Sequence, residues 1–201
     1  MLGELVRRHD DRALDLYLLL KAKASGGEWN VHLPAAVWAR CLGLDETRGR
    51  AAVSKAWQRL ERLELVARAR SGRMADVRLL HEEADGTVYE PPAGTRRDPY
   101  FKIPFAYWLS PDRYYRTLDL PAKAMLLVAL SLKDDAELPL VRVPDWYGLS
   151  EDTAGRGLKE LERRGLVSVR VAYTPAPLTV TGYHEHRHIR VDSEFRNGGL
   201  L

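Results

Sequence analysis

The sequence predicts an α+β fold, mainly α-helical, in which two similar units follow one another along the chain. The first observation is a repeated motif: residues 43–66 and 148–167 both begin with Gly-Leu and end with Leu-Val. The second is a segment rich in Glu, Asp, Gly and Pro at 82–98, which separates the two copies. The third is the length, because 201 residues accommodate two domains of roughly 100 residues each.

The first unit shows the order helix, short strand, two helices and hairpin. Leu14 and Leu18 belong to an apolar stripe with helical spacing. Pro34 suits the start of a helix, and Gly43 suits the end of one. We expect a helix at 12–25, a short strand at 29–33, a helix at 34–42, a further helix that follows it and ends at 63, and strands at 65–70 and 75–80.

The second unit opens with an aromatic run at 100–108, for which a strand and loop that pack a core are favoured over a surface that stacks nucleic-acid bases. Ser150 is placed to cap a helix. We expect helices at 120–132, 144–147 and 151–164, and strands at 166–173 and 184–192. The predicted domains are 1–83 and 100–195, joined by a linker at 84–99 and followed by a flexible tail at 196–201.

The second copy of the motif, residues 148–167, resembles the turn, recognition helix and first wing strand of bacterial winged helix-turn-helix regulators. The first copy departs from this pattern, because four additional residues follow Gly43-Leu44 before the helix comes into register. The resemblance implies two winged helix-turn-helix domains in tandem and double-stranded DNA as the partner.

Helical geometry gives each copy a core face and an exposed basic face. In the first helix Lys55, Gln58 and Arg62 lie opposite the apolar side, and Arg156, Lys159 and Arg163 correspond to them at a constant offset. Arg and Lys donate to guanine and Gln pairs with adenine, although a solvated basic face is the alternative interpretation. The predicted DNA-contacting residues are Arg48, Arg50, Ser54, Lys55, Gln58, Arg59, Arg62, Arg70, Arg73, Thr153, Arg156, Lys159 and Arg163.

Charge distinguishes the two copies. Residues 40–80 contain ten Lys or Arg and five Asp or Glu, a formal charge of +5. The second helix instead begins with Glu151 and Asp152, which repel phosphate. We therefore expect the first unit to be the stronger DNA binder, with Arg70 and Arg73 of its wing on the DNA backbone, and the second to bind weakly or to serve as a dimer or partner surface.

A second resemblance concerns residues 101–104 and 118–127. Phe-Lys-Ile-Pro followed by an apolar helix containing Ala122-Lys123 is similar to the opening of winged-helix domains in plasmid replication initiators. Three functions follow as hypotheses: a transcriptional regulator, a replication-initiation or partition factor of a plasmid or phage, and a tandem winged-helix module that binds a protein. The basic triads count against the third, and monomeric and homodimeric forms both remain open.

The sequence shows no pattern of catalytic residues, so we do not expect an enzyme or a bound cofactor. His184, His186 and His188 lie on the outer face of a strand, where an exposed strand is favoured over a metal site. The single cysteine, Cys41, fits a buried thiol in a reducing cytosol. Without a signal peptide or membrane-spanning run, we expect a cytoplasmic, nucleoid-associated protein without a membrane partner.

Overall fold

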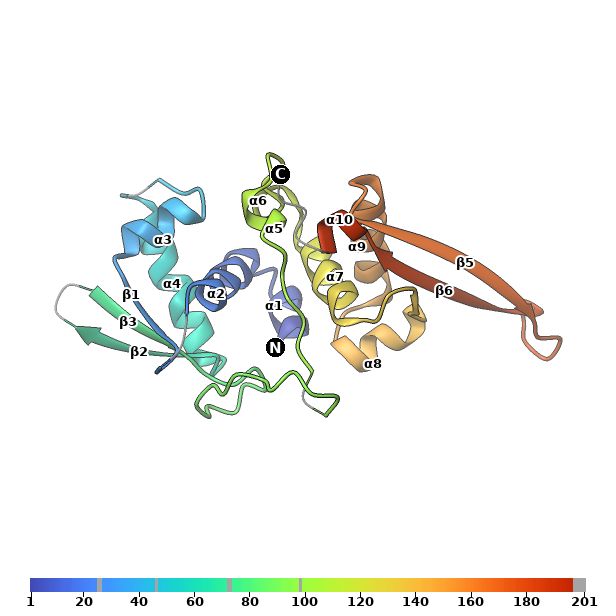
Figure 1. The fold of residues 1–201 in the computed structure, drawn as a ribbon, viewed down its shortest axis with the longest axis horizontal. Helices are drawn as coiled ribbons and strands as arrows, with labels where there is room; N and C mark the ends of the chain where they lie inside the picture. Colours follow the sequence, from blue (N-terminus) through green and yellow to red (C-terminus); the bar gives the residue numbers. More distant parts are fainter. Residues whose placement is uncertain (25–26, 46, 72–73, 98, 197–201) are drawn as a thin grey trace. The chain divides into compact units, whose positions relative to one another are not determined.

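The computed structural model describes residues 1–24, 27–45, 47–71, 74–97 and 99–196, with the backbone alone for Arg70, Ser71 and Glu194. Helices make up 45% of the chain and strands 19%, a mixed composition that is compatible with the predicted α+β fold. Apart from its first two residues, the chain divides into two compact units, one from Gly3 to Ala93 and one from Gly94 onward (Figure 1).

The first unit combines helices with a three-stranded antiparallel sheet. Its core contains Leu14 and Leu20 of the second helix, Trp57 and Leu60 of the fourth, and Val77 of the sheet, all at most 3% exposed. The elements are α1 (Leu2–Arg7), α2 (Asp11–Lys23), β1 (Asn30–Leu33), α3 (Ala35–Cys41), α4 (Gly49–Arg62), β2 (Val66–Ser71) and β3 (Met74–Leu79).

The second unit is built around the apolar helix α7, which is packed against α9. Met125 and Leu126 of α7 and Leu161 of α9 are almost completely buried. The elements are α5 (Ala106–Leu109), α6 (Tyr114–Thr117), α7 (Leu120–Ser131), β4 (Ala136–Glu137), η1 (Leu140–Arg142), α8 (Val143–Tyr147), α9 (Glu151–Arg163), β5 (Val167–Pro175), β6 (Tyr183–Val191) and α10 (Ser193–Arg196).

The two units share one chain path. In each, a helix is followed by a strand, two helices and a hairpin, and the first strand pairs with the last, which lies in the centre of the sheet. The strand orders are β1-β3-β2 and β4-β6-β5. The turns correspond as well, since Gly43 and Gly148 adopt left-handed φ angles of 71° and 67° between the two helices that precede each hairpin.

Several segments differ from the sequence-based expectations. Residues 100–105 form no strand; a short helix, α5, begins after Pro104, which has no N–H to offer a ladder. Residues 136–137, for which no strand was predicted, form β4 because β6 offers them a free edge. Helix α1 was not expected, and Phe195 in α10 is buried. Residues 197–201 of the predicted tail lie outside the described residues.

Part of the predicted linker at 84–99 packs on the first unit. Val88 forms a bridge with Leu80, and the N–H of His81 donates to the carbonyl of Thr87 at 2.9 Å. Tyr89 is 8% exposed, and its ring packs edge to face against the ring of Trp29, with 5.3 Å between the two ring centroids. These contacts explain why the boundary between the compact units falls after Ala93 rather than at the start of the acidic segment.

Candidate nucleic-acid interface

Helices α4 and α9 each present a buried apolar face and an exposed polar face, as the sequence predicts. Val53, Ala56 and Leu60 of α4 have no exposed surface, and Ala154 and Leu161 of α9 have none either. The predicted triads all lie on the exposed side. They consist of Lys55, Gln58 and Arg62 in α4, and of Arg156, Lys159 and Arg163 in α9.

Both helices end in the same hydrogen-bonded turn. The N–H of Leu65 donates to the carbonyl of Leu60 at 3.1 Å, and the N–H of Leu166 donates to that of Leu161 at 2.9 Å. The residue before each donor has a left-handed φ: 54° at Glu64 and 69° at Gly165. This turn directs each chain from its helix into the first strand of the hairpin.

A glutamate at equivalent positions ties each helix to the strand that follows it. The Glu61 carboxylate accepts hydrogen bonds from the Arg68 guanidinium at 2.6 and 3.0 Å. The Glu162 carboxylate accepts one from the backbone N–H of Val169 at 3.2 Å. The Leu-Glu pair of the repeated motif therefore has a structural role, which sequence reasoning missed because the acceptor's partner lies on the next element.

The start of α4 accounts for the four additional residues of the first copy. The helix begins at Gly49, and the Asp45 carboxylate accepts hydrogen bonds from the N–H groups of Thr47 and Arg48 at 3.0 and 2.7 Å. The additional residues thus precede α4 rather than extend it. Arg48, Arg50 and the Ser54 side chain are exposed at or near this end of the helix.

Two of the three cations of α9 are paired with acids of the same helix. Arg156 lies 3.0 Å from the Asp152 carboxylate, and Arg163 donates two hydrogen bonds to the Glu160 carboxylate at 2.6 and 2.8 Å. These bonds, with a further one from Arg164, lower the pKa of Glu160 to about 2. Counting all charged residues of α9, three basic and four acidic, its formal charge is −1.

The start of α9 uses its predicted cap. The Ser150 hydroxyl accepts a hydrogen bond from the N–H of Thr153 at 3.1 Å and also bonds the Thr153 hydroxyl at 2.8 Å. The predicted cap at Ser150 is confirmed. Thr153, predicted to contact DNA, is half-buried, and its hydroxyl takes part in this cap.

The exposed face of α4 has a different charge. The helix carries four basic residues and one acidic residue, a formal charge of +3. Among the residues that the structure describes, neither Lys55 nor Arg62 has a carboxylate within ion-pair distance. The single acid, Glu61, is engaged with Arg68, as described above. Lys55 and Arg62 are therefore available to an external anion.

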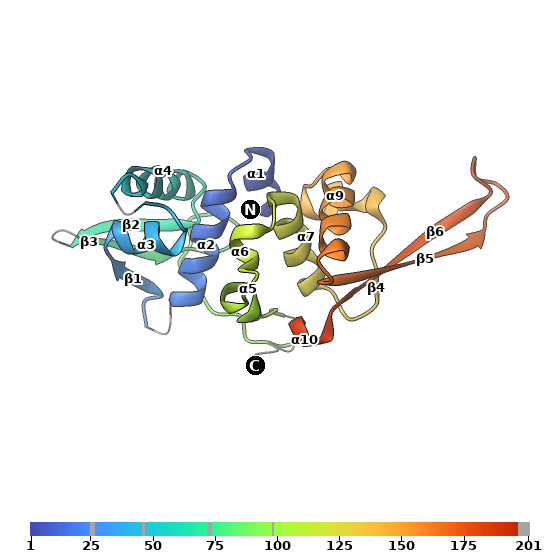
Figure 2. The same cartoon turned by 90° about the horizontal axis from the view of Figure 1, so that it is seen from above.

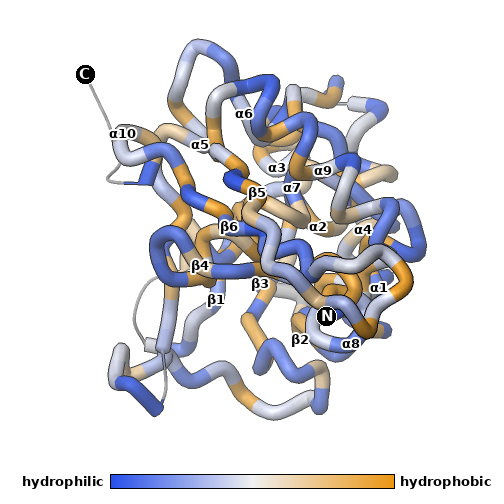
Figure 3. The backbone as a smooth tube through the Cα atoms, turned by 90° about the vertical axis from the view of Figure 1, so that its right-hand side faces the viewer, coloured by the Kyte–Doolittle hydropathy of each residue, from blue (hydrophilic) through white to orange (hydrophobic). Residues whose placement is uncertain are grey.

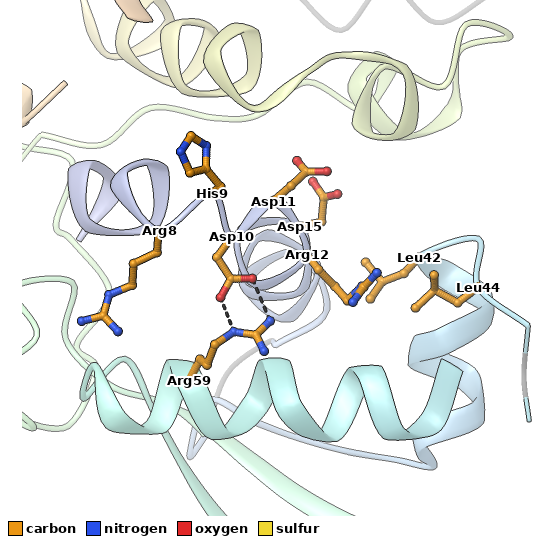
Figure 4. A pocket seen from close by; sticks show the side chains of 9 residues that line it. All are labelled: Arg8, His9, Asp10, Asp11, Arg12, Asp15, Leu42, Leu44 and Arg59. Carbon is orange, nitrogen blue, oxygen red and sulfur yellow. Dashed lines mark hydrogen bonds and ion pairs between the residues drawn. The ribbon is translucent and has the colours of Figure 1, made fainter. Parts of the chain in front are cut away.

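Arg59 is an exception among the predicted contact residues of α4. It forms a two-point ion pair with Asp10, in which the Arg59 Nη2 lies 2.8 Å from the Asp10 Oδ1 (Figure 4). Asp10 is 8% exposed and also caps α2, accepting from the N–H of Ala13 at 3.1 Å. The hydrogen bonds to Asp10 raise the pKa of Arg59. This pair fastens α4 to the start of α2, a contact that no local pattern reveals.

The hairpin of the first unit, β2 and β3, carries cations that are also paired. Arg68 bonds Glu61, and Arg78 forms an ion pair with Glu28. The backbone of Arg70 pairs with Ala75 in the β2–β3 ladder, whereas its side chain is not described. Arg73, the other predicted wing contact, lies outside the described residues.

The histidines of β6 have neighbours of their own. His186 Nδ1 lies 2.8 Å from the Glu137 carboxylate and its Nε2 lies 2.8 Å from the Thr174 hydroxyl, while His188 Nδ1 lies 3.2 Å from the carbonyl of Asp135. In the described part of the chain, one group brings metal-ligating atoms within 4.8 Å of one another. It consists of His81, Glu83 and Asp85 in the loop after β3.

Comparison with known proteins does not place this chain in a family. No family model matches the sequence, and no curated protein shows significant similarity to it. Within the described ranges, none of the helices combines the length and the apolar character that crossing a bilayer requires.

Proposed function

We propose that this protein binds double-stranded DNA in a sequence-specific manner as a transcriptional regulator, and that its two units are winged helix-turn-helix domains. The order helix, strand, helix, helix, hairpin in both units supports the proposal, because this is the element order in which a recognition helix precedes a wing. The three-stranded sheets with the first strand beside the third agree with the same architecture.

The observation that carries the proposal is the exposed face of α4. Lys55, Gln58 and Arg62 point away from the core on a helix of charge +3, and the two cations have no ion-pair partner among the described residues. Long donors on one helix face are what base edges and phosphates require. Helix α4 is thus the recognition helix of the proposal.

The second unit has a lesser role in DNA binding. Because Arg156 and Arg163 are neutralised by Asp152 and Glu160, DNA contact through α9 would replace existing ion pairs rather than add new ones. Glu151 and Asp152 also place negative charge at the end of the helix that would face phosphate.

The experiment is selection of bound duplexes from genomic fragments, followed by affinity measurements on the enriched sequence. Lys55→Ala and Gln58→Ala are expected to weaken binding by roughly 1–3 kcal/mol each and to relax preference at one position of the site. Lys159→Ala, at the position of α9 equivalent to Gln58, is the matched control and is expected to have a smaller effect. Absence of an enriched duplex, or equal losses for Gln58→Ala and Lys159→Ala, would contradict the proposal.

The genomic positions of the selected fragments separate the two DNA-binding hypotheses. Scattered promoter sites support a transcriptional regulator, whereas an array of iterated sites at one locus supports a replication-initiation or partition factor.

A further inference from the structure

The hairpin of the second unit extends beyond the three-stranded part of its sheet. Strands β5 and β6 have nine residues each and pair along their whole length, from Val167↔Val191 to Pro175↔Tyr183. The third strand, β4, pairs only with His188 and Ile189 of β6. Beyond that point, the described residues form a two-stranded ribbon that extends away from α7 and α9 (Figures 1 and 2). We call residues 171–187 the arm.

One face of the arm continues the apolar pattern of the core. In β5 every second residue is apolar or aromatic from Val167 to Pro175, and near the core its partners in β6 are Ile189 and Val191. Orange and blue segments alternate where the hairpin leaves the core (Figure 3). Val167, Ile189 and Val191 are buried, but further out Val171 is 40% and Tyr173 63% exposed. The arm therefore presents the core-facing side of the sheet to solvent.

The opposite face of the hairpin is polar. It carries Ser168, Arg170, Ala172 and Thr174 in β5, paired with Arg190, His188, His186 and His184 of β6. A ribbon with solvent on both sides has no need of a persistent apolar face, and an isolated two-stranded hairpin is marginally stable in water. The alternation in β5 thus indicates that one side of the arm is covered by another surface.

The tip and the apolar face do not suit a nucleic-acid partner. Residues 173–183 contain no charged side chain, and Leu178 and Val180 at the tip are fully exposed, at 103% and 107%. On the apolar face Arg187 pairs with Glu185, so this face is electrically neutral. The exposed Arg170 is engaged by Asp135. A polyanion would gain no Coulombic attraction from such a surface.

The same surface is complementary to itself. We propose that the arm is a homodimerisation element, in which the apolar faces of two arms pack against each other about a two-fold axis. Packed antiparallel, each copy's Arg187 meets the other copy's Glu185, and the neutral tips do not repel. Tyr173 and Tyr183, whose ring centroids lie 6.2 Å apart, supply the large aromatic surfaces that interface centres favour.

The test is the oligomeric state of the full chain without DNA, measured by sedimentation equilibrium. The wild type is expected to dimerise, and Tyr173→Lys is expected to raise the dimer dissociation constant roughly tenfold or more, as loss of a central aromatic anchor does. Thr174→Lys adds the same charge one residue away on the polar face and is expected to leave the dimer intact. A monomeric wild type, or equal behaviour of the two variants, overturns the proposal.

Cross-linking provides a second measurement that does not depend on how well a charged variant folds. In a Cys41→Ser background, Tyr173→Cys is expected to form a covalent dimer with a short bifunctional maleimide, whereas Thr174→Cys is not. Cross-linking of both variants or of neither overturns the proposed packing. Because no DNA is present, these outcomes are independent of the DNA-binding proposal. A Tyr173→Lys variant that remains dimeric but changes DNA bending would assign the arm to DNA instead.

Discussion

Helices α4 and α9 occupy equivalent places in the two units, but they differ in charge and packing. Position 59 of α4 is an arginine that reaches Asp10 of α2, whereas the equivalent position 160 of α9 is a glutamate that binds Arg163 and Arg164 of its own turn. The first arrangement uses the cation to hold two helices together and leaves other cations exposed. The second pairs Arg163 and Arg164 with an acid of the same turn, so the same motif has different surface chemistry in the two units.

The two helices also differ in packing at one further position. Gly157 of α9 lies so close to α7 that a Cβ there would stand 2.4 Å from the carbonyl oxygen of Pro121. The equivalent residue of α4, Ala56, carries a methyl group and is fully buried. The α7–α9 contact therefore requires a glycine, and the corresponding contact of α4 does not.

The largest expected effect is that of a substitution at Gly157, which tests this packing difference. Gly157→Ala is expected to destabilise the second unit by about 3 kcal/mol, because the clashing atom belongs to the backbone and has little freedom to move. Gly155→Ala, with no atom within 4 Å of its Cβ, is the control and is expected to stabilise α9 by up to about 1 kcal/mol. Hydrogen exchange of α9 amides measures both. Equal effects would contradict the close approach.

A smaller effect tests the role of Arg59. Arg59→Met removes two charge-assisted hydrogen bonds from a buried carboxylate and is expected to destabilise the first unit by about 2 kcal/mol. Arg62→Met, on the exposed face three residues later, is expected to change stability by less than about 0.5 kcal/mol while weakening DNA binding. Urea denaturation and DNA retention measure the two properties. A stability loss for Arg62→Met as large as that for Arg59→Met would refute the division of roles.

The helix-ending turns offer a reciprocal pair of substitutions. Gly165→Ala places a side chain at a φ of 69° and is expected to cost about 1 kcal/mol. Glu64→Gly relieves the same strain at a φ of 54°, but it also loosens the unfolded chain, so a gain of only about 0.5 kcal/mol is expected. Thermal unfolding of the two variants should shift in opposite directions. Shifts of the same sign would show that the turns are not equivalent.

The smallest effect concerns the pH range over which Glu160 stays ionised and paired with Arg163. The pKa of Glu160 is lowered from 4.5 to about 2, so its pairing favours folding above the unfolded value and is lost as the pH falls through the folded one. We expect a carboxyl titration of Glu160 by NMR to have its midpoint near 2, and Arg163→Ala to move the midpoint upward. A midpoint near 4.5 in the unsubstituted protein would mean that Arg163 is free.

The sequence correctly predicted features that depend on neighbours along the chain. The core faces of α4 and α9 follow from helical spacing, and the Ser150 cap is a contact across one turn of helix. The exposed positions of His184 and Arg190 follow from strand alternation, whereas His186 and His188, predicted on the same exposed face, are half-buried. Each of these depends on residues that are only two to four positions apart.

Features that join distant segments were not predictable in this way. Asp10 lies 49 residues before Arg59, and no periodicity connects the two. The strand at 136–137 exists because β6 pairs with it, and the aromatic run at 100–108 was wrongly expected to contain a strand because its composition suits one. Pairing partners, not propensity, decide such segments.

By itself, the sequence determined that this protein has two units with equivalent motifs, each with a helix whose polar side carries a triad of long side chains, because repeat and periodicity are properties of the chain alone. The tertiary structure decided which charges remain free. Whether a cation faces solvent or a carboxylate depends on the carboxylates that folding brings within about 4 Å, where ion pairs form. For α4 that partner comes from another helix, and for α9 it comes from its own.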